Sequence, residues 1–266
     1  MSLVGRRIID NLKRKIGRYY ILPVPPYGSI HYWEKVYKQL SPQDVFEWGQ
    51  IHAEDLDPHD FRVIQFGGKP VNSAPTRTTS LGSALDINTQ DSQTCTIVLG
   101  CGISTVGEEL VRYHGWSGRI SQVDFVNKVI EELKVKLQDL PNAEAILDDA
   151  TTLSTFEDCS VDAVMDKGLI DTIFCADEYE KVDDIMKSVH RVLKPGGVFC
   201  VFSFSRPEFI LPRMEKVDLQ QFDRMWNAVE VRECFQKIIM YRFRKVAEDL
   251  SRLKKGRRKE GIKVPR

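Results

Sequence analysis

Hydrophobic residues between positions 94 and 243 fall into short runs, and amphipathic stretches separate most of these runs. Each of five runs is short, mainly apolar and followed by a turn residue or a polar cluster, which is the pattern of a buried strand. These predicted strands are Cys95–Leu99, Arg119–Asp124, Ala145–Leu147, Val161–Met165 and Val198–Phe204. Apolar residues three and four positions apart predict helices over Thr105–Tyr113, Val126–Gln138 and Tyr179–Leu193. The alternation predicts a parallel sheet covered by helices.

The last two apolar runs, Ala228–Val231 and Phe235–Phe243, have no helix between them. Such neighbours form a hairpin, which adds one antiparallel strand to an otherwise parallel sheet. Before them, the turn Lys194-Pro-Gly-Gly197 stops the third helix. We therefore expect the α/β class, as a Rossmann-like seven-stranded sheet that is mostly parallel, with helices on both faces and one antiparallel strand.

A Gly-x-Gly turn joins the first predicted strand to the first predicted helix. Gly100 and Gly102 carry no Cβ, so the chain can turn sharply there and a ligand can approach the backbone. The following helix directs free backbone N–H groups at the same place. Asp124 ends the second strand, 24 residues after Gly100, where an acidic side chain can bind the hydroxyls of a ribose. This combination predicts a site for an adenosine-bearing cofactor.

Two further acidic residues follow strand ends. Asp149, together with the N–H group of Ala150, suits the edge of an adenine, although Asp149 also fits the N-cap of a helix beginning at Thr151. Asp166 follows the fourth strand, and ligands of open α/β sheets bind beyond the carboxyl ends of the strands. The residue three after Gly102 is Thr105, so the G-x-G-x-x-G fingerprint of dinucleotide oxidoreductases is incomplete.

The ends of the chain differ from its centre. Residues 1–28 form a basic, amphipathic segment and a proline-rich linker, which fits a mitochondrial transit peptide and a basic surface helix equally well. Residues 29–246 form the predicted catalytic domain, with a disordered insertion at about 57–93, where Gly, Pro, Ser and Thr replace any apolar period. Residues 247–266 form a basic tail, which is most often a solvated end, with RNA contact as the weaker alternative.

Composition excludes several classes of protein. Thirty-eight basic and 38 acidic residues give a formal net charge of zero, so there is no general signal for binding DNA or another polyanion. The six cysteines form no C-x-x-C pair and the five histidines no metal-binding spacing, which argues against disulfides and metal sites. No apolar run approaches the ~18 residues that span a bilayer. We expect a cytoplasmic or mitochondrial protein.

These motifs, taken in order, resemble the class I S-adenosylmethionine-dependent methyltransferases. Within that class, four segments are similar to the protein-lysine methyltransferases of translation elongation factor 1A and of citrate synthase. The segments are Tyr32-Trp-Glu-Lys-Val-Tyr37, Phe46-Glu-Trp48, Leu99-Gly-Cys-Gly-Ile-Ser104 and Met165-Asp-Lys-Gly-Leu-Ile-Asp171. The corresponding family patterns are Tyr-Trp-x-x-Arg-Tyr, Tyr-Asp-Trp, Gly-Cys-Gly-Asn-Ser and Asp-Lys-Gly-Thr-x-Asp. The resemblance covers about residues 30–50 and 94–243.

The resemblance implies S-adenosyl-L-methionine as cofactor and a protein lysine, of the elongation factor or citrate synthase type, as substrate. It assigns the cover of the cofactor to aromatic side chains, its methionine portion to the glycine turn and its ribose and adenine to residues at the next strand ends. The implied cofactor residues are Trp33, Tyr37, Phe46, Gly100, Gly102, Asp124, Phe125, Asp149, Ala150 and Lys167. Asp166 and Asp171 are the predicted catalytic residues, because their carboxylates can attract and orient an incoming ammonium group, although Asp171 fits the cap of the next helix equally well.

The sequence departs from the family pattern at four positions. Val36 replaces arginine, Phe46 tyrosine, Ile103 asparagine and Leu169 threonine, so each departure removes a polar group near the cleft. Two other functions stay open: methyl transfer to RNA or a small molecule, and a module that binds the cofactor without catalysis.

Overall fold

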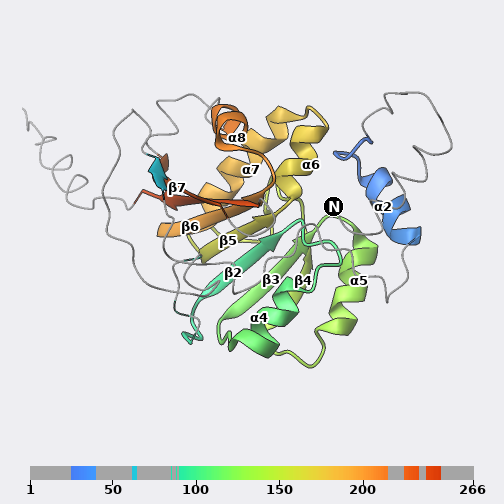
Figure 1. The fold of residues 1–266 in the computed structure, drawn as a ribbon. Helices are drawn as coiled ribbons and strands as arrows, with labels where there is room; N and C mark the ends of the chain where they lie inside the picture. Colours follow the sequence, from blue (N-terminus) through green and yellow to red (C-terminus); the bar gives the residue numbers. More distant parts are fainter. Residues whose placement is uncertain are drawn as a thin grey trace, which may run out of the picture.

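The computed structural model describes residues 25–39, 62–64, 85, 88, 90–214, 225–233 and 238–246. The predicted transit segment, Phe46, most of the predicted insertion and the basic tail lie outside these residues. Fourteen elements follow one another along the described chain (Figure 1). The strands are β1 (Arg62–Ile64), β2 (Cys95–Leu99), β3 (Arg119–Asp124), β4 (Ala143–Leu147), β5 (Val161–Lys167), β6 (Leu193–Ser203), β7 (Trp226–Glu233) and β8 (Ile239–Lys245). The helices are α2 (Ile30–Gln39), α4 (Val106–His114), α5 (Asn127–Lys136), α6 (Leu169–Cys175), α7 (Tyr179–Val192) and α8 (Pro207–Met214).

All described strands form one sheet, in the order β1-β7-β8-β6-β5-β2-β3-β4. Strands β2 to β6 pair in parallel, and β8 runs antiparallel to both β6 and β7. The seven strands β2 to β8 therefore confirm the predicted fold class, with β8 as the reversed strand. The short strand β1 adds an antiparallel edge beside β7. Strand β1 lies inside the segment that was predicted to be a disordered insertion. Residues 62–64 of that segment therefore belong to the sheet instead.

The two faces of the sheet are covered by different helices. Helices α4 and α5 pack on one face, and α6, α7 and α8 pack on the other (Figure 1). Each face has its own apolar cluster: Val129, Ile130 and Leu133 of α5 lie in one, and Val182, Ile185, Met186, Val189 and Val192 of α7 lie in the other. The apolar period of each helix therefore points at the sheet, as the sequence predicts.

Helix α6 was not predicted. Residues Ile170 to Phe174 of this helix are all buried, the polar Asp171 and Thr172 included. Its polar and apolar positions therefore do not mark an exposed and a buried face, which is the pattern by which a surface helix is predicted. Strand β6 also begins earlier than predicted, at Leu193. Leu193 pairs with Val161, and the next pair is Val198 with Ala163, so residues 194–197 form a bulge within β6.

None of the described helices is long and apolar enough to cross a membrane. The five described cysteines are free thiols.

Candidate functional site

A cavity of about 330 Å³ lies at the carboxyl ends of β2, β3 and β5. This is the edge of the sheet at which ligands of open α/β folds bind, and the volume is at the lower end of the range for small-molecule sites. Its walls come from the strand ends, from α6 and α7, and from residues 27–37 around α2. Among the predicted cofactor residues, those that line it are Trp33, Tyr37, Gly100, Gly102, Asp124, Phe125, Asp149, Ala150 and Lys167.

The glycine turn forms one wall because it has no side chains to fill the space. Gly100 and Gly102 both have φ of 52°, a conformation that glycine adopts at no steric cost. A Cβ on Gly100 would lie 2.9 Å from the Cβ of Leu169, and a Cβ on Gly102 would lie 2.6 Å from the hydroxyl of Tyr37. Glycine is therefore required at both positions by backbone angle and by packing.

Asp124 holds this turn in place. The side chain is 5% exposed, and its Oδ2 atom accepts a hydrogen bond of 2.9 Å from the N–H of Gly102. Its Oδ1 atom accepts one of 3.0 Å from the N–H of Val126. Burial raises the pKa of Asp124 to about 6, and these backbone donors limit the rise. Asp124 therefore has a structural task beside the ribose-binding role that the sequence predicts.

Aromatic side chains from the segment around α2 form the outer wall. The rings of Trp33 and Tyr37 are stacked, with centroids 5.8 Å apart. The indole N–H of Trp33 donates a hydrogen bond of 2.6 Å to the carbonyl of Tyr27. Burial raises the pKa of the Tyr37 hydroxyl well above its ordinary value, with the Asp124 carboxylate adding to the rise. The hydroxyl therefore stays protonated and the wall carries no charge there.

The loop after β4 forms another side of the cavity. Asp149 is exposed, and its Oδ1 accepts hydrogen bonds from the N–H and the hydroxyl of Thr151, at 2.8 and 2.7 Å. Asp149 thus caps a turn, as the alternative interpretation held, but no helix follows. The carbonyl of Ala150 accepts a 2.6 Å hydrogen bond from Ser188 of α7, which fixes the loop against that helix.

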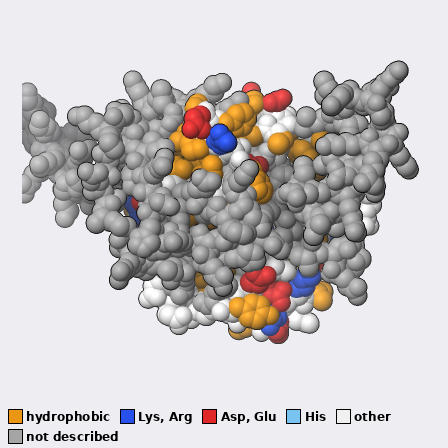
Figure 2. Space-filling model, viewed as in Figure 1, with side chains coloured by type: hydrophobic (Ala, Val, Ile, Leu, Met, Phe, Trp, Pro, Cys, Tyr) orange, Lys and Arg blue, Asp and Glu red, His pale blue; other side chains and the backbone are white. Residues whose placement is uncertain are grey.

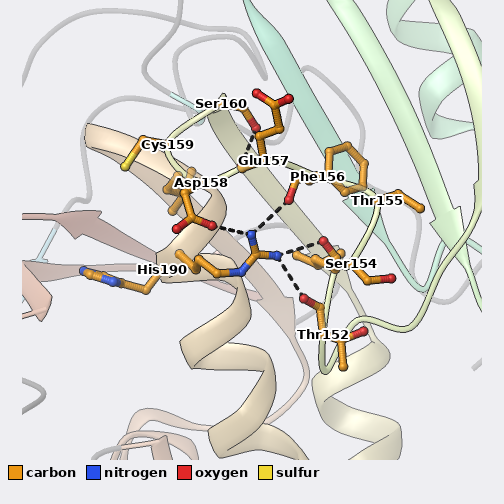
Figure 3. Close-up of polar contacts among 12 residues, drawn as sticks. Thr152, Ser154, Thr155, Phe156, Glu157, Asp158, Cys159, Ser160 and His190 are labelled. Atoms are coloured by element: carbon orange, nitrogen blue, oxygen red, sulfur yellow. Dashed lines mark hydrogen bonds and ion pairs between the residues drawn. The ribbon is translucent and has the colours of Figure 1, made fainter.

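Arg191 of α7 binds the next part of this loop, residues 152–158, several of which are labelled in Figure 3. Its guanidinium donates to the carbonyls of Thr152, Leu153 and Phe156, at 3.0, 2.8 and 2.9 Å, and to the carboxylate of Asp158 at 2.6 Å. One side chain thereby satisfies three backbone carbonyls of an irregular segment. No pattern in the sequence indicates this role, because Arg191 meets these groups only when α7 packs on the sheet.

Asp166 is fully buried at the end of β5 and does not line the cavity. Its carboxyl oxygens accept hydrogen bonds from the N–H groups of Leu169 and Ile170, at 2.8 and 3.2 Å, and so cap α6. Burial raises the pKa of Asp166 to about 8, and the neighbouring Asp171 adds to the rise. The next residue, Lys167, is 8% exposed and does line the cavity.

Asp166→Asn is expected to reduce the loss of stability that accompanies rising pH. With a folded pKa of about 8 against an ordinary value of 3.8, Asp166 binds a proton more tightly in the folded protein. This group's contribution is therefore greatest at low pH and declines as pH rises between those two values. Melting temperatures of both proteins from pH 5.5 to 8.5 measure the effect. Parallel curves would contradict it.

Asp171, in the first turn of α6, points away from the cavity and supports the chain after β6. Its Oδ2 accepts a 2.9 Å hydrogen bond from the N–H of Phe204, and its Oδ1 accepts from the hydroxyls of Ser203 and Ser205. Tyr241 donates to the carbonyl of Ser205 at 2.6 Å.

Phe204 and Phe209 are 39% and 40% exposed, and Figure 2 shows hydrophobic side chains gathered over α8 and α6.

The structure therefore separates the predicted residues into two groups. Nine of the predicted cofactor residues share the cavity, whereas Asp166 and Asp171 lie behind its wall and hold α6 and the end of β6. Their catalytic role stays a prediction. The lining residues that the sequence did not indicate include Tyr27, Ser104, Thr172, Lys181 and Asp184. Lys181 and Asp184 read as ordinary exposed positions of an amphipathic helix, so no sequence signal singled them out.

The geometry fits an adenosyl cofactor. Two glycines bring bare backbone to the cavity, with the side chains of Leu169 and Tyr37 packed closely against them. A buried carboxylate stands at the next strand end, and aromatic rings cover the outer side. Among the described residues, no group of three or more His, Cys, Asp or Glu side chains could hold a metal ion.

Comparison with known proteins agrees with this geometry. Residues 97–201 match the family Methyltransf_11, described as a methyltransferase domain. The chain is 27% identical over 184 residues to the eEF1A lysine and N-terminal methyltransferase of Bos taurus, covering 68% of this chain and 22% of that protein. It is 24% identical over 192 residues to EEF1A lysine methyltransferase 4 of Mus musculus, covering 69% and 64%. A SAM-dependent methyltransferase of Methanosarcina mazei aligns at 16% identity, with a TM-score of 0.46, over 60% of this chain and 96% of its own.

These matches support the resemblance: residues 97–201 match a methyltransferase domain, and about two thirds of the chain is similar to the eEF1A lysine methyltransferases. The matched part spans about a fifth of the first relative and somewhat less than two thirds of the second.

Proposed function

We propose that this class I methyltransferase domain transfers methyl groups from S-adenosyl-L-methionine to a lysine side chain of a protein substrate. The observation that carries the proposal is the cavity, in which the glycine turn, Asp124 and the stacked aromatics meet at the carboxyl edge of the sheet. The lysine substrate is supported by the names of the curated relatives, which are called eEF1A lysine methyltransferases.

Each part of the cofactor has residues that would hold it. The backbone of Gly100 and Gly102 suits the methionine portion, Asp124 the ribose hydroxyls, and Asp149 with Ala150 the adenine. Trp33 and Tyr37 cover the outer side. When bound, the cofactor supplies an activated methyl group on a sulfonium centre.

The remaining work of the protein is alignment and exclusion of water. A lysine side chain has an ordinary pKa of about 10.4 and must lose its proton before it can act as a nucleophile. An apolar wall favours that loss, because burial disfavours the charged ammonium. Ile103, Leu169 and Ile173 supply such a wall here. Two of the departures from the family pattern, Ile103 and Leu169, thus make the cavity more apolar.

Methylation of a purified substrate tests the proposal. The protein is incubated with labelled S-adenosyl-L-methionine and either purified eEF1A or fractionated lysate, and the modified residue is located by mass spectrometry. The proposal predicts label on a protein lysine. Label on RNA or a small molecule would identify the other class of methyltransferase. Cofactor binding without transfer to any component would support a silent module instead.

Asp171→Ala is expected to lower the methylation rate at least about tenfold while changing cofactor affinity less than about twofold. The variant leaves the N–H of Phe204 and the hydroxyls of Ser203 and Ser205 without their acceptor, which loosens the end of β6. Asp171 does not line the cavity, so cofactor contacts persist. Rate assays and calorimetry with S-adenosylhomocysteine measure the two quantities. Wild-type turnover would contradict the prediction.

A further inference from the structure

The outer wall of the cavity is one short segment of chain, residues 25–39, here called the lid segment. Four of its residues line the cavity: Tyr27, Gly28, Trp33 and Tyr37. The ring of Trp33 contacts those of both Tyr27 and Tyr37, at centroid distances of 5.9 and 5.8 Å. These three aromatic residues therefore contact one another and all line the cavity.

The lid segment has little apolar attachment to the rest of the domain. Tyr37 is the one fully buried residue of α2, and Trp33 is partly buried against the same apolar cluster. A segment with so few buried side chains gains little from apolar burial, so polar contacts contribute strongly to how firmly it is held. Hydrogen bonds at its two ends therefore attach the segment to the domain.

A lysine side chain holds each end of the segment. Lys128 of α5 donates a 3.0 Å hydrogen bond to the carbonyl of Tyr37, in the last turn of α2. A positive charge is favoured there, because the carbonyl end of a helix carries partial negative charge. Lys181 of α7 donates a 3.0 Å hydrogen bond to the carbonyl of Gly28.

The Gly28 end is packed closely. Lys181 also pairs with Glu178 at 2.6 Å, and a Cβ on Gly28 would lie only 1.7 Å from the carboxylate of Glu178. Glycine at this position therefore allows the backbone to lie directly against the charged pair of α7.

The two lysines belong to opposite layers of the fold. Helix α5 covers one face of the sheet and α7 the other, and α2 lies alongside the strand tips near α5 (Figure 1). The lid segment is thus fastened across the open edge of the sheet, from one helical layer to the other.

We propose that Lys128 and Lys181 are positioning residues that hold the lid segment closed over the cavity and thereby set how fast the cofactor and its product leave. This inference rests on the proposed function, because it assumes that the cavity binds an adenosyl cofactor. Release of either lysine frees one end of the aromatic wall, and the glycine turn and Asp124 remain in place because neither lysine contacts them.

The probe is S-adenosylhomocysteine, whose dissociation is followed by stopped-flow tryptophan fluorescence. Lys128→Ala and Lys181→Ala are each expected to raise the dissociation rate about five- to tenfold, the net effect of losing one ordinary hydrogen bond in a partly solvated position. Lys181→Arg, which keeps a charged donor, is expected to stay within about twofold of wild type. Lys134→Ala, on the exposed side of α5, is the matched control and leaves the rate unchanged.

Amide hydrogen exchange on the cofactor-free variants gives a readout that does not depend on the proposed function. Both alanine variants are expected to exchange faster in residues 27–39 and at the wild-type rate in β2 and β3. Unchanged exchange in that segment, or unchanged dissociation rates, would overturn the proposal. If exchange is faster but the protein does not bind S-adenosylhomocysteine, the attachment of the lid segment by the two lysines is supported, and the proposed function is overturned instead.

Discussion

Asp124→Ala is expected to weaken binding of S-adenosylhomocysteine about 100-fold or more. The carboxylate accepts hydrogen bonds from the N–H groups of Gly102 and Val126, and each buried donor left without a partner costs roughly 1–3 kcal/mol. Loss of Asp124 would therefore release the glycine turn and also remove the carboxylate that we propose as the partner of the ribose hydroxyls. Isothermal titration calorimetry measures the affinity.

Asp139→Ala provides a matched control for this variant. Asp139 is exposed and pairs with Arg112 at 2.7 Å on the surface between α5 and β4. A fully exposed pair of this kind contributes little to stability, and Asp139 does not line the cavity. The control variant is expected to bind as wild type does. Equal affinity in the Asp124 variant and in wild type would overturn our account of the site.

Gly102→Ala is expected to weaken the same binding about tenfold or more by two effects that act together. The new Cβ would lie 2.6 Å from the Tyr37 hydroxyl, so the stacked aromatic wall must move outward. The backbone at φ of 52° would also cost roughly 1–2 kcal/mol with alanine in place of glycine. Calorimetry and thermal unfolding separate the loss of affinity from the loss of stability.

Gly196→Ala separates backbone strain from loss of the cavity wall. Gly196 lies in the bulge of β6 with φ of 82°, and a Cβ there would meet no atom within 4 Å. Its variant carries a similar backbone cost but touches nothing near the cavity. We expect lower stability in both glycine variants and weaker binding only in that of Gly102. Equal affinities would show that the contact with Tyr37 has no part in binding.

Residues next to one another in the chain were predicted most successfully. The bounds of β2 and β3 agree with the predicted strands, and Gly100, Gly102 and Asp124 meet as expected, because each stands at the end of a parallel strand. Asp149 was harder to interpret, since a carboxylate after a strand suits both a ligand and a turn cap, and the structure shows that it caps a turn beside the cavity.

The catalytic assignments show the opposite case. Asp166 and Asp171 follow the same predicted strand, and the sequence left open whether both face the cleft or Asp171 caps the next helix. Because α6 begins directly after β5, its first turn takes both carboxylates behind the cavity wall, where they bind backbone and hydroxyl groups. Polar and apolar residues from Ile170 to Phe174 are all buried, so the sequence does not indicate which side of α6 faces the cavity.

The local order of the chain was enough to establish the alternating strands and helices, the reversed strand and the glycine turn, because hydrophobic period and turn chemistry act between near neighbours. Packing alone brought Lys128, Lys181 and Arg191 to the backbone carbonyls that they bind, from 91, 153 and up to 39 residues away. Such contacts depend on how two helical layers fold onto one sheet. No pattern of neighbouring residues encodes which distant carbonyl a surface lysine or arginine will meet.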